Sequence, residues 1–266
     1  MIKKKIPEYL NKIIEAKQSE VDFLKSKYGL NYFKEKVSQD SQFKSVFSSV
    51  LARPGLQLIA EVKKASPSKG IINSNFDPIK VAQQYAQNGA SLLSVLTEKK
   101  YFLGHPRYIN YIKSDINLPI IRKDFIFDEL QVYESRCLNA DAILLIAAIL
   151  EDSRLQELIH LSAQLGLDVI VEIHNESELQ RVLDLKEVKI IGINNRNLNT
   201  FSVDINIASI LFKNYFKDNN NYLTVAESGY CSVSELKAIE SVGFSGVLIG
   251  EGLVKHKDII DYFKKK

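Results

Sequence analysis

The sequence predicts an α/β fold, namely a (β/α)8 TIM barrel with an N-terminal helical extension. From about Leu56 onward, short β-rich runs alternate with segments of helical periodicity, and the runs number eight. An open doubly wound sheet usually has fewer strands and a GxGxxG turn, which this chain lacks. We expect a single domain over residues 1–266, with the extension at 1–50 and the barrel at 51–266. The strand candidates are LQLIAEVK, SLLSVLTE, LPIIRKDF, DAILLIAA, DVIVEIH, VKIIGINN, YLTVAES and SGVLIG.

The first 50 residues lie outside this repeat. They predict two helices, one near Pro7 to Tyr28 and another near Ser41 to Leu51. We expect these helices to pack on the barrel.

Capping residues mark the helices inside the repeat. Asp77 followed by Pro78 supplies an N-cap and a first-turn proline, and Gly89 supplies the stop about three turns later. Further start signals are the pairs Ser232 with Glu235 and, more weakly, Asn175 with Glu178, and a further stop is Gly243.

Composition excludes several classes of protein. Hydrophobic residues make up 45% and charged residues 25%, which is average for a globular chain, and a net charge of +3 does not imply nucleic acid. Cys137 and Cys231 are far apart, so neither a disulfide framework nor a zinc site is indicated and a reducing cytoplasm fits. The N-terminus lacks a signal-peptide core, and the longest apolar run, Ala142 to Leu150, is too short to span a bilayer.

The first strand candidate carries charge where a core strand would not. Side chains alternate along a strand, so Ile59, Glu61 and Lys63 share one side. If that side is the barrel interior, charges are tolerated at the carboxyl-terminal mouth, where barrel enzymes place their active sites. Other strands end in polar residues at equivalent heights, and these are Lys123, Glu172, Asn194, Arg196, Glu227 and Ser228. This convergence predicts a functional site at the mouth.

Two glycine-containing loops suggest a ligand that carries phosphate. Strand seven leads into Ser228 and Gly229, and strand eight leads into Gly250 and Glu251, so adjacent loops offer backbone N–H groups. The alternative is that these glycines only cap turns. We expect Ser66 or Lys63 to complete the cradle, the loop KASPSKG to act as a lid, and Phe102 either to stack on a flat substrate or simply to pack.

These residues, in this order, resemble indole-3-glycerol-phosphate synthase of tryptophan biosynthesis. The motifs are RPGLQLIAEVKKASPSKG, SVLTEKKYF, IIRKDFI, DAILLIAAIL, VEIHN, IGINNRNL, VAESG and LIGEGLV, and they run through nearly the whole chain. The resemblance implies a carboxy-lyase that converts 1-(2-carboxyphenylamino)-1-deoxyribulose 5-phosphate to indole-3-glycerol phosphate, CO2 and water. It implies no metal or organic cofactor. The segment YLNKIIEAKQSEVDFLK resembles the family's extra helix, which is implied to cover the mouth and help bind substrate.

The resemblance also implies roles for residues. Lys123 is the acid that protonates the substrate carbonyl, Glu172 is the general base, and Lys63 holds the carboxylate and is a second candidate acid. Glu61 orients Lys63 or Lys123 by charge pairing. The resemblance further implies that Asn194 and Glu227 contact the sugar, that Arg196 contacts the substrate carboxylate or an active-site acid, and that Ser228 lies on the floor of the site. The implied phosphate contacts are Ser66, Gly229, Gly250 and the backbone of Glu251. The implied contacts with the ring are Phe102 and Leu198. At position 251 the family commonly has serine, so we expect the carboxylate of Glu251 to turn away from the phosphate.

Two alternatives remain open from the sequence. One is a sibling phosphate-binding barrel, such as a phosphoribosyl isomerase or an aldolase with Lys123 as Schiff-base nucleophile. The other is a catalytically silent barrel that binds a sugar phosphate. We expect a monomeric protein of the cytoplasm that acts on a small phosphorylated molecule. We expect it to bind neither nucleic acid nor membrane. Association with other tryptophan-pathway enzymes is left open.

Overall fold

Eight parallel strands close into a barrel, as the sequence predicts. The computed structural model describes residues 1–3, 6–40, 42–67, 69–219 and 221–264. The barrel strands are hydrogen-bonded in the closed order β1, β10, β9, β8, β7, β6, β5, β4. They span β1 Gln57–Val62, β4 Leu92–Leu96, β5 Ile120–Lys123, β6 Ala142–Ile146, β7 Asp168–Ile173, β8 Ile190–Asn194, β9 Leu223–Glu227 and β10 Gly246–Ile249.

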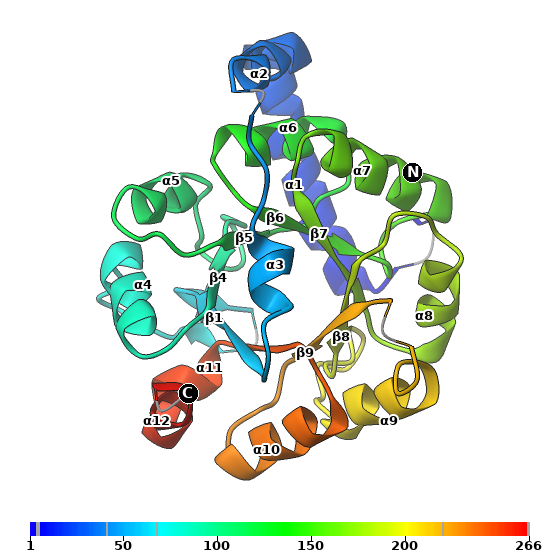
Figure 1. The fold of residues 1–266 in the computed structure, drawn as a ribbon. Coiled ribbons are helices and arrows are strands. Elements are labelled where there is room, and N and C mark those ends of the chain that lie inside the picture. The colour runs from blue at the N-terminus through cyan, green and yellow to red at the C-terminus, as the bar shows by residue number, and fades with distance from the viewer. Residues whose placement is uncertain (4–5, 41, 68, 220, 265–266) are drawn as a thin grey trace.

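Helices surround the barrel and follow its strands (Figure 1). Because this ring covers the sheet from outside while side chains fill the barrel, strands such as β4, β6 and β8 are buried along their whole length. The helices are α4 Pro78–Gln87, α5 Arg107–Lys113, α6 Glu129–Cys137, α7 Asp152–Gln164, α8 Glu176–Leu183, α9 Asn206–Tyr215, α10 Val233–Val242, α11 Glu251–Lys255 and α12 Lys257–Lys264.

The predicted caps are confirmed. The Asp77 carboxylate accepts hydrogen bonds from the backbone N–H groups of Ile79 and Lys80 at 3.0 and 3.2 Å. Ser232 and Glu235 form a complete capping box at the start of α10. That helix ends at Gly243, whose φ of 112° lies in the left-handed region that glycine favours.

The N-terminal extension differs in part from the prediction. The first helix, α1 Glu8–Lys27, is as expected, but the sequence reading missed α2 Gly29–Ser38. Gly29 has a φ of 71°, so it turns the chain after α1, and it then begins α2. The expected helix from Ser41 to Leu51 is shorter, α3 Phe47–Leu51, and Ser41 lies outside the described residues.

A side-chain cap explains the late start of α3. Ser45 accepts a hydrogen bond from the Phe47 N–H at 3.0 Å, and its hydroxyl donates to Asp168 at the first residue of β7. This contact ties the residues just before the helix to the start of β7. The short helix α3 lies in front of the strands in Figure 1, at the end of the barrel where they begin.

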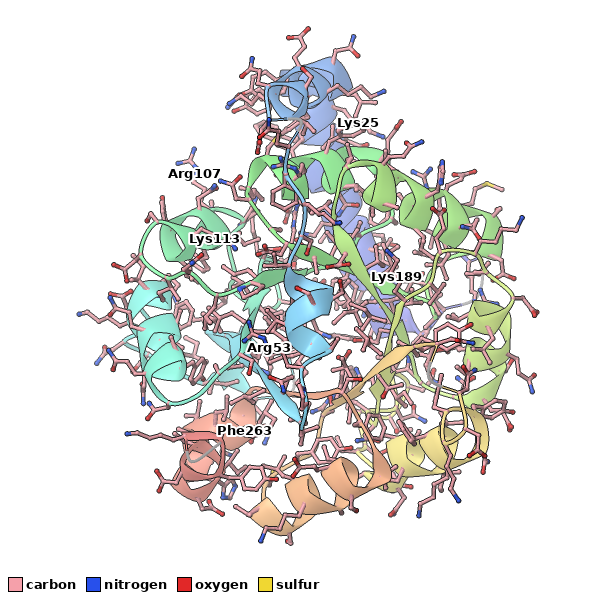
Figure 2. All side chains as sticks on the ribbon, viewed as in Figure 1. Lys25, Arg53, Arg107, Lys113, Lys189 and Phe263 are labelled. Carbon is pink, nitrogen blue, oxygen red and sulfur yellow. The ribbon has the colours of Figure 1, made fainter. Side chains whose placement is uncertain are left out.

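The two ends of the barrel thus carry different structures. α1 runs behind the strands in Figure 1, at the end opposite α3. Lys113 marks the α3 end, since it pairs with Asp141, the residue before β6, at 2.5 Å (Figure 2). At the α1 end, the loop after β1 holds a small antiparallel hairpin of β2 Ala65–Ser66 and β3 Gly70–Ile71. Among the described residues, no helix is both long and apolar enough to cross a membrane.

Candidate active site

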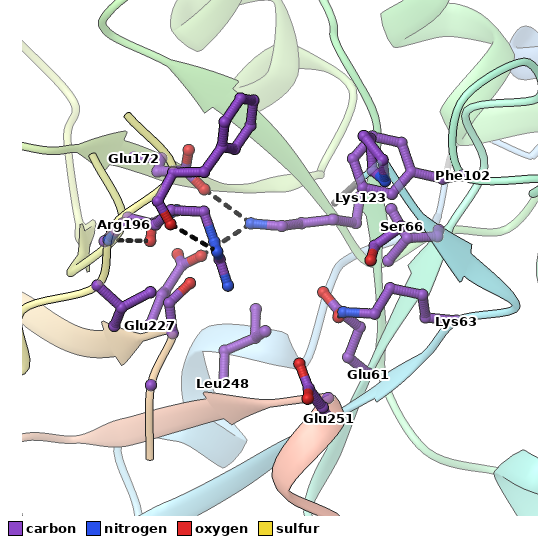
Figure 3. Close-up of a pocket in the computed structure, with 18 of the residues that line it drawn as sticks. Glu61, Lys63, Ser66, Phe102, Lys123, Glu172, Arg196, Glu227, Leu248 and Glu251 are labelled. Atoms are coloured by element: carbon purple, nitrogen blue, oxygen red, sulfur yellow. Dashed lines mark hydrogen bonds and ion pairs between the residues drawn. The ribbon is translucent and has the colours of Figure 1, made fainter. Parts of the chain in front are cut away.

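A cavity of about 400 Å³ opens at the carboxyl-terminal ends of the barrel strands (Figure 3). Its lining comes from strand tips and the loops that follow them, because parallel strands bring their carboxyl ends to one rim. All fourteen site residues that the sequence suggested line this one cavity: Glu61, Lys63, Ser66, Phe102, Lys123, Glu172, Asn194, Arg196, Leu198, Glu227, Ser228, Gly229, Gly250 and Glu251.

Lys123 lies at the centre of the polar groups. It is the last residue of β5, and its Nζ donates to Glu172 Oε2 at 2.7 Å and to Glu227 Oε2 at 2.8 Å (Figure 3). The two carboxylates come from β7 and β9, so three strands that are not neighbours meet at one ammonium group. A lysine held by two carboxylates is charged and fixed in direction.

The pKa values in this cluster move apart. Burial lowers the pKa of Lys123, but Glu172 and Glu227 outweigh burial and raise it. Burial raises the pKa of Glu172, but Lys123 and His174 outweigh burial and lower it. Burial, with the neighbouring charge of Glu172, raises the pKa of Glu227 to about 7, although Lys123 opposes the rise. Among the described residues, Glu172 pairs with two cationic groups and Glu227 with one, so Glu227 is the carboxylate that takes up a proton first as the pH falls.

Glycines leave room for the charged side chains. A Cβ atom on Gly192 of β8 would lie 2.3 Å from Glu227 Oε1. A Cβ atom on Gly250 would lie 2.4 Å from Glu61 Oε1 and 3.0 Å from Lys63 Nζ. The contacts with the two carboxylate oxygens are too short for a real carbon atom, so glycine at these positions leaves room for Glu227 and Glu61.

Glu61 and Lys63 form a second ion pair across the cavity from Glu227 (Figure 3). Glu61 is buried in β1, and Lys63 follows the strand directly. The pair keeps the Lys63 ammonium at the wall of the cavity.

The β8 rim contributes an amide and a guanidinium. Asn194 accepts a hydrogen bond from the Arg196 backbone N–H at 3.0 Å, and Arg196 Nη1 donates to the Phe201 carbonyl at 3.1 Å. The guanidinium thus reaches into the cavity (Figure 3). Its expected contact with a substrate carboxylate stays a prediction.

The β9 and β10 loops form the other end of the cavity. Ser228 and Gly229 have φ values of 67° and 97°, so two successive residues take the left-handed conformation and turn the loop sharply. Glu251 opens α11, and its carboxylate pairs with Lys69 and with Lys255, the latter at 2.6 Å. Burial raises the pKa of Glu251, but hydrogen bonds from both lysines outweigh it and lower this pKa to about 2.

The expectation that the Glu251 carboxylate turns away from a bound phosphate stays a prediction. The side chain lines the cavity and is neutralised by two lysines, which together carry one more positive charge than Glu251 carries negative. An anion at this end therefore does not meet an uncompensated carboxylate.

The sequence did not identify the helix residues that close the cavity. Tyr9 and Leu10 of α1 line it, and the Tyr9 ring packs edge-on against Phe201 at a centroid distance of 4.6 Å. A signal was present in the sequence, because apolar residues of this segment recur at helical spacing. The resemblance indicated that this helix covers the mouth without showing which face does so.

Lys17 anchors α1 to the strand that carries Lys123. It is only 1% exposed, although it is a lysine in the apolar stripe of the helix. Its Nζ lies 2.9 Å from Asp124 Oδ1 and 3.1 Å from Glu20 Oε2. Asp124 also accepts from the Thr97 hydroxyl at 2.6 Å and pairs with Arg122 at 3.2 Å. A buried charged network thus joins the extension to the residue next to Lys123.

Replacing Lys17 with methionine is expected to destabilise the protein by about 3 kcal/mol, because the change leaves Asp124 buried with one cation fewer. Chemical denaturation followed by circular dichroism measures the effect. Lys12→Met is the matched control on the same helix, since Lys12 pairs with Glu8 on the exposed face. The control should leave the midpoint unchanged. Equal midpoints for both variants would contradict the anchoring role of Lys17.

No group of three or more histidine, cysteine, aspartate or glutamate side chains within the described ranges is arranged to hold a metal ion. The cationic groups at the cavity are lysines and an arginine, which suit a ligand with carboxylate and phosphate groups.

Comparison with known proteins assigns the chain to a family. The family model described as indole-3-glycerol phosphate synthase matches residues 10–265. The indole-3-glycerol phosphate synthase of Chlorobium chlorochromatii (strain CaD3) is 45% identical over 248 residues, which cover 92% of this chain and 95% of that protein. The corresponding protein of Prochlorococcus marinus subsp. pastoris is 40% identical over 266 residues, covering 98% and 90%.

Solved structures support the fold alone. The N-acetylmannosamine-6-phosphate 2-epimerase from Clostridium perfringens superposes with a TM-score of 0.57 at 16% identity, covering 79% of this chain and 92% of that one. KGPDC from Streptococcus mutans has the same TM-score at 14% identity, covering 79% and 96%. These two structures show only a shared fold, whereas the family model and the sequence relatives identify the family. The chain belongs to the indole-3-glycerol phosphate synthase family.

Proposed function

We propose that the cavity described above carries out the indole-3-glycerol phosphate synthase reaction with Lys123 as the acid and Glu172 as the base. The activity itself follows from family membership, and the chain is a carboxy-lyase of tryptophan biosynthesis. The observation that supports the assignment of roles is the placement of Lys123 Nζ between the carboxylates of Glu172 and Glu227.

The proposed substrate is 1-(2-carboxyphenylamino)-1-deoxyribulose 5-phosphate. In the first step the ring carbon that bears the carboxylate attacks the ribulose carbonyl, and the carbonyl oxygen takes a proton from Lys123. The raised pKa of Lys123 means that this proton is present at neutral pH, and the two carboxylates fix its direction. Loss of CO2 then restores the aromatic ring.

Dehydration completes the indole. The hydroxyl formed from the carbonyl leaves as water, and a proton is removed from the adjacent carbon that bears nitrogen. Glu172 suits the removal of this proton, because its lowered pKa keeps it ionised. Lys63 holds the substrate carboxylate in the first step and is a second candidate acid for the departing hydroxyl. Glu61 orients it through their ion pair.

The remaining residues bind the substrate in this proposal. Phosphate lies against Ser66, Gly229, Gly250 and the backbone of Glu251, with Ser228 on the floor beneath the reacting sugar. Asn194 and Glu227 contact the sugar, while Phe102 and Leu198 pack against the aromatic ring. Lys69 and Lys255 offset the charge of Glu251.

Turnover of the ribulose phosphate tests the proposal directly. We expect purified protein to produce indole fluorescence and to release one CO2 for each indole formed. Binding of the substrate without fluorescence would instead support a silent sugar-phosphate barrel. Borohydride separates the aldolase alternative, since a Schiff base at Lys123 would be trapped as a stable adduct. We expect no adduct, because a lysine charged by two carboxylates is not a nucleophile.

We also propose that the protein acts as a cytoplasmic monomer on this small molecule, without nucleic acid, membrane or metal. The net charge of +3 is too small to imply a polyanionic partner. Cys137 and Cys231 are both free thiols, which suits a reducing compartment.

A further inference from the structure

His174 lies directly behind Glu172 and is not used in the reaction proposed above. It follows β7, two residues after Glu172, so both side chains project to the same side of the strand. Its side chain is 6% exposed. His174 Nε2 lies 3.2 Å from Glu172 Oε1, and His174 Nδ1 lies 3.1 Å from Glu178 Oε2. The imidazole therefore lies between two carboxylates, hydrogen-bonded to Glu178 and ion-paired with Glu172.

The start of α8 fixes the second carboxylate. Asn175 is the N-cap of this helix and accepts from the Glu178 backbone N–H at 3.0 Å. Glu178 reaches back, where it accepts from the His174 backbone N–H at 2.9 Å and from Asn175 Nδ2 at 2.9 Å. The cap thus holds the Glu178 carboxylate against the His174 ring in one orientation.

Two carboxylates on one imidazole require a cation. A neutral ring has a lone pair on one nitrogen, which would face a carboxylate, whereas the imidazolium has a proton for each side. Burial lowers the pKa of His174, but Glu172 and Glu178 outweigh burial and raise it to about 9. At neutral pH the line Glu178, His174, Glu172, Lys123 therefore alternates in charge.

Other charged groups nearby do not undo this arrangement. Arg181 of α8 pairs with Asp152 of α7, so these two largely neutralise one another. Lys3 lies near Glu178, and burial together with Arg181 lowers its pKa while Glu178 and Asp152 oppose that change. On the cavity side, Glu172 meets Lys123, which it shares with Glu227.

We propose that His174, held by Glu178, is a positioning residue that keeps Glu172 ionised and orients it as the base. The inference rests on the proposed role of Glu172. Without His174, Lys123 would be the cationic partner of both Glu172 and Glu227, and either carboxylate could be protonated first as the pH falls. With His174 present, Glu227 is protonated before Glu172, and Glu172 is free to accept a proton from the substrate.

The test is the pH profile of turnover by His174→Asn. Activity needs ionised Glu172, so it rises with pH through the pKa of that group, and removal of His174 raises this pKa. We expect the acid limb of kcat/KM to move up by about one pH unit. We also expect kcat at pH values below this limb to fall about tenfold, while kcat above the limb and KM change little. Glu178→Gln should move the limb in the same direction by less, since the imidazole then keeps one carboxylate.

His160→Asn is the matched control. His160 also pairs with a glutamate, Glu187, at 2.9 Å, but this pair is exposed on α7. Its pH profile should match that of the unaltered protein. An acid limb unmoved in folded His174→Asn would overturn the proposal, and if that variant does not fold, an unmoved limb in Glu178→Gln overturns it.

The two proposals fail in different ways. Absence of turnover by the unaltered protein, or full turnover by Glu172→Gln, removes the proposed function and this inference with it. Normal turnover that is lost in Glu172→Gln, combined with an unmoved acid limb in the His174 and Glu178 variants, removes only the role of His174.

Discussion

Lys123→Ala is expected to lower kcat by about 10⁴-fold, at the upper end of what one general acid contributes. The change removes the ammonium group that donates to both Glu172 and Glu227. KM should change much less, because the substrate's phosphate and carboxylate are proposed to bind elsewhere in the cavity. Steady-state kinetics followed by indole fluorescence, with substrate affinity measured separately by calorimetry, provide the comparison.

Lys113→Ala is the matched control for this variant. Lys113 also pairs with a carboxylate, Asp141, but it lies at the end of the barrel opposite the cavity (Figure 2). Its removal should leave kcat and KM as they are. If Lys123→Ala retains more than about a tenth of the original kcat, Lys123 is not the acid. If both variants lose activity together with their folded structure, the effect is on stability, and Lys123→Met, which keeps the chain length, replaces alanine in the test.

The strands and most of the site were accessible from the sequence because both depend on local periodicity. Alternation along β1 put Glu61 and Lys63 on one side, and the barrel then brought the tips of β5, β7 and β9 to the same rim. The cap signals at Asp77 and Ser232 were readable for the same reason, since each depends on residues within four positions.

Contacts between distant residues were not accessible in this way. Lys17 and Asp124 are 107 positions apart, and only the docking of α1 on the mouth brings them together. The lysine in the apolar stripe of α1 was nevertheless a sign that a buried partner exists. The helix α2 was not predicted from the sequence. Gly29 follows α1, and a glycine at that place indicates the end of a helix but does not indicate that another helix begins there.

Position 174 shows how a local signal can be read only in part. Asn175 and Glu178 predicted the start of α8, and that start is confirmed. The sequence did not show that the Glu178 side chain also reaches the ring of His174, or that Glu172 lies on the other side of that ring. The contact between His174 and Glu172 depends on which side of β7 faces the barrel interior, and this is fixed only when the barrel closes.

Glu172→Gln is expected to lower kcat by about 10³-fold, because glutamine keeps the size of the side chain and its contact with Lys123 but cannot accept a proton. Substrate affinity should be nearly unchanged. The acid limb of the pH profile that reports ionisation of Glu172 should also disappear from the residual activity. Glu134→Gln is a suitable control, since Glu134 pairs with the buried Arg122 at 2.8 Å and does not line the cavity.

The control separates loss of chemistry from loss of a buried charge. Glu134→Gln should lower the thermal midpoint, because the buried Arg122 then loses one of its two carboxylate partners among the described residues and keeps Asp124, yet it should preserve kcat. Glu172→Gln should show the reverse, a folded protein with little turnover. Removing Glu172 also leaves Lys123 with one carboxylate, so Glu227 then gives up its proton at lower pH than before. If kcat of Glu172→Gln stays within about threefold of the original, proton removal is done by another group, and Glu227 is the carboxylate best placed for it.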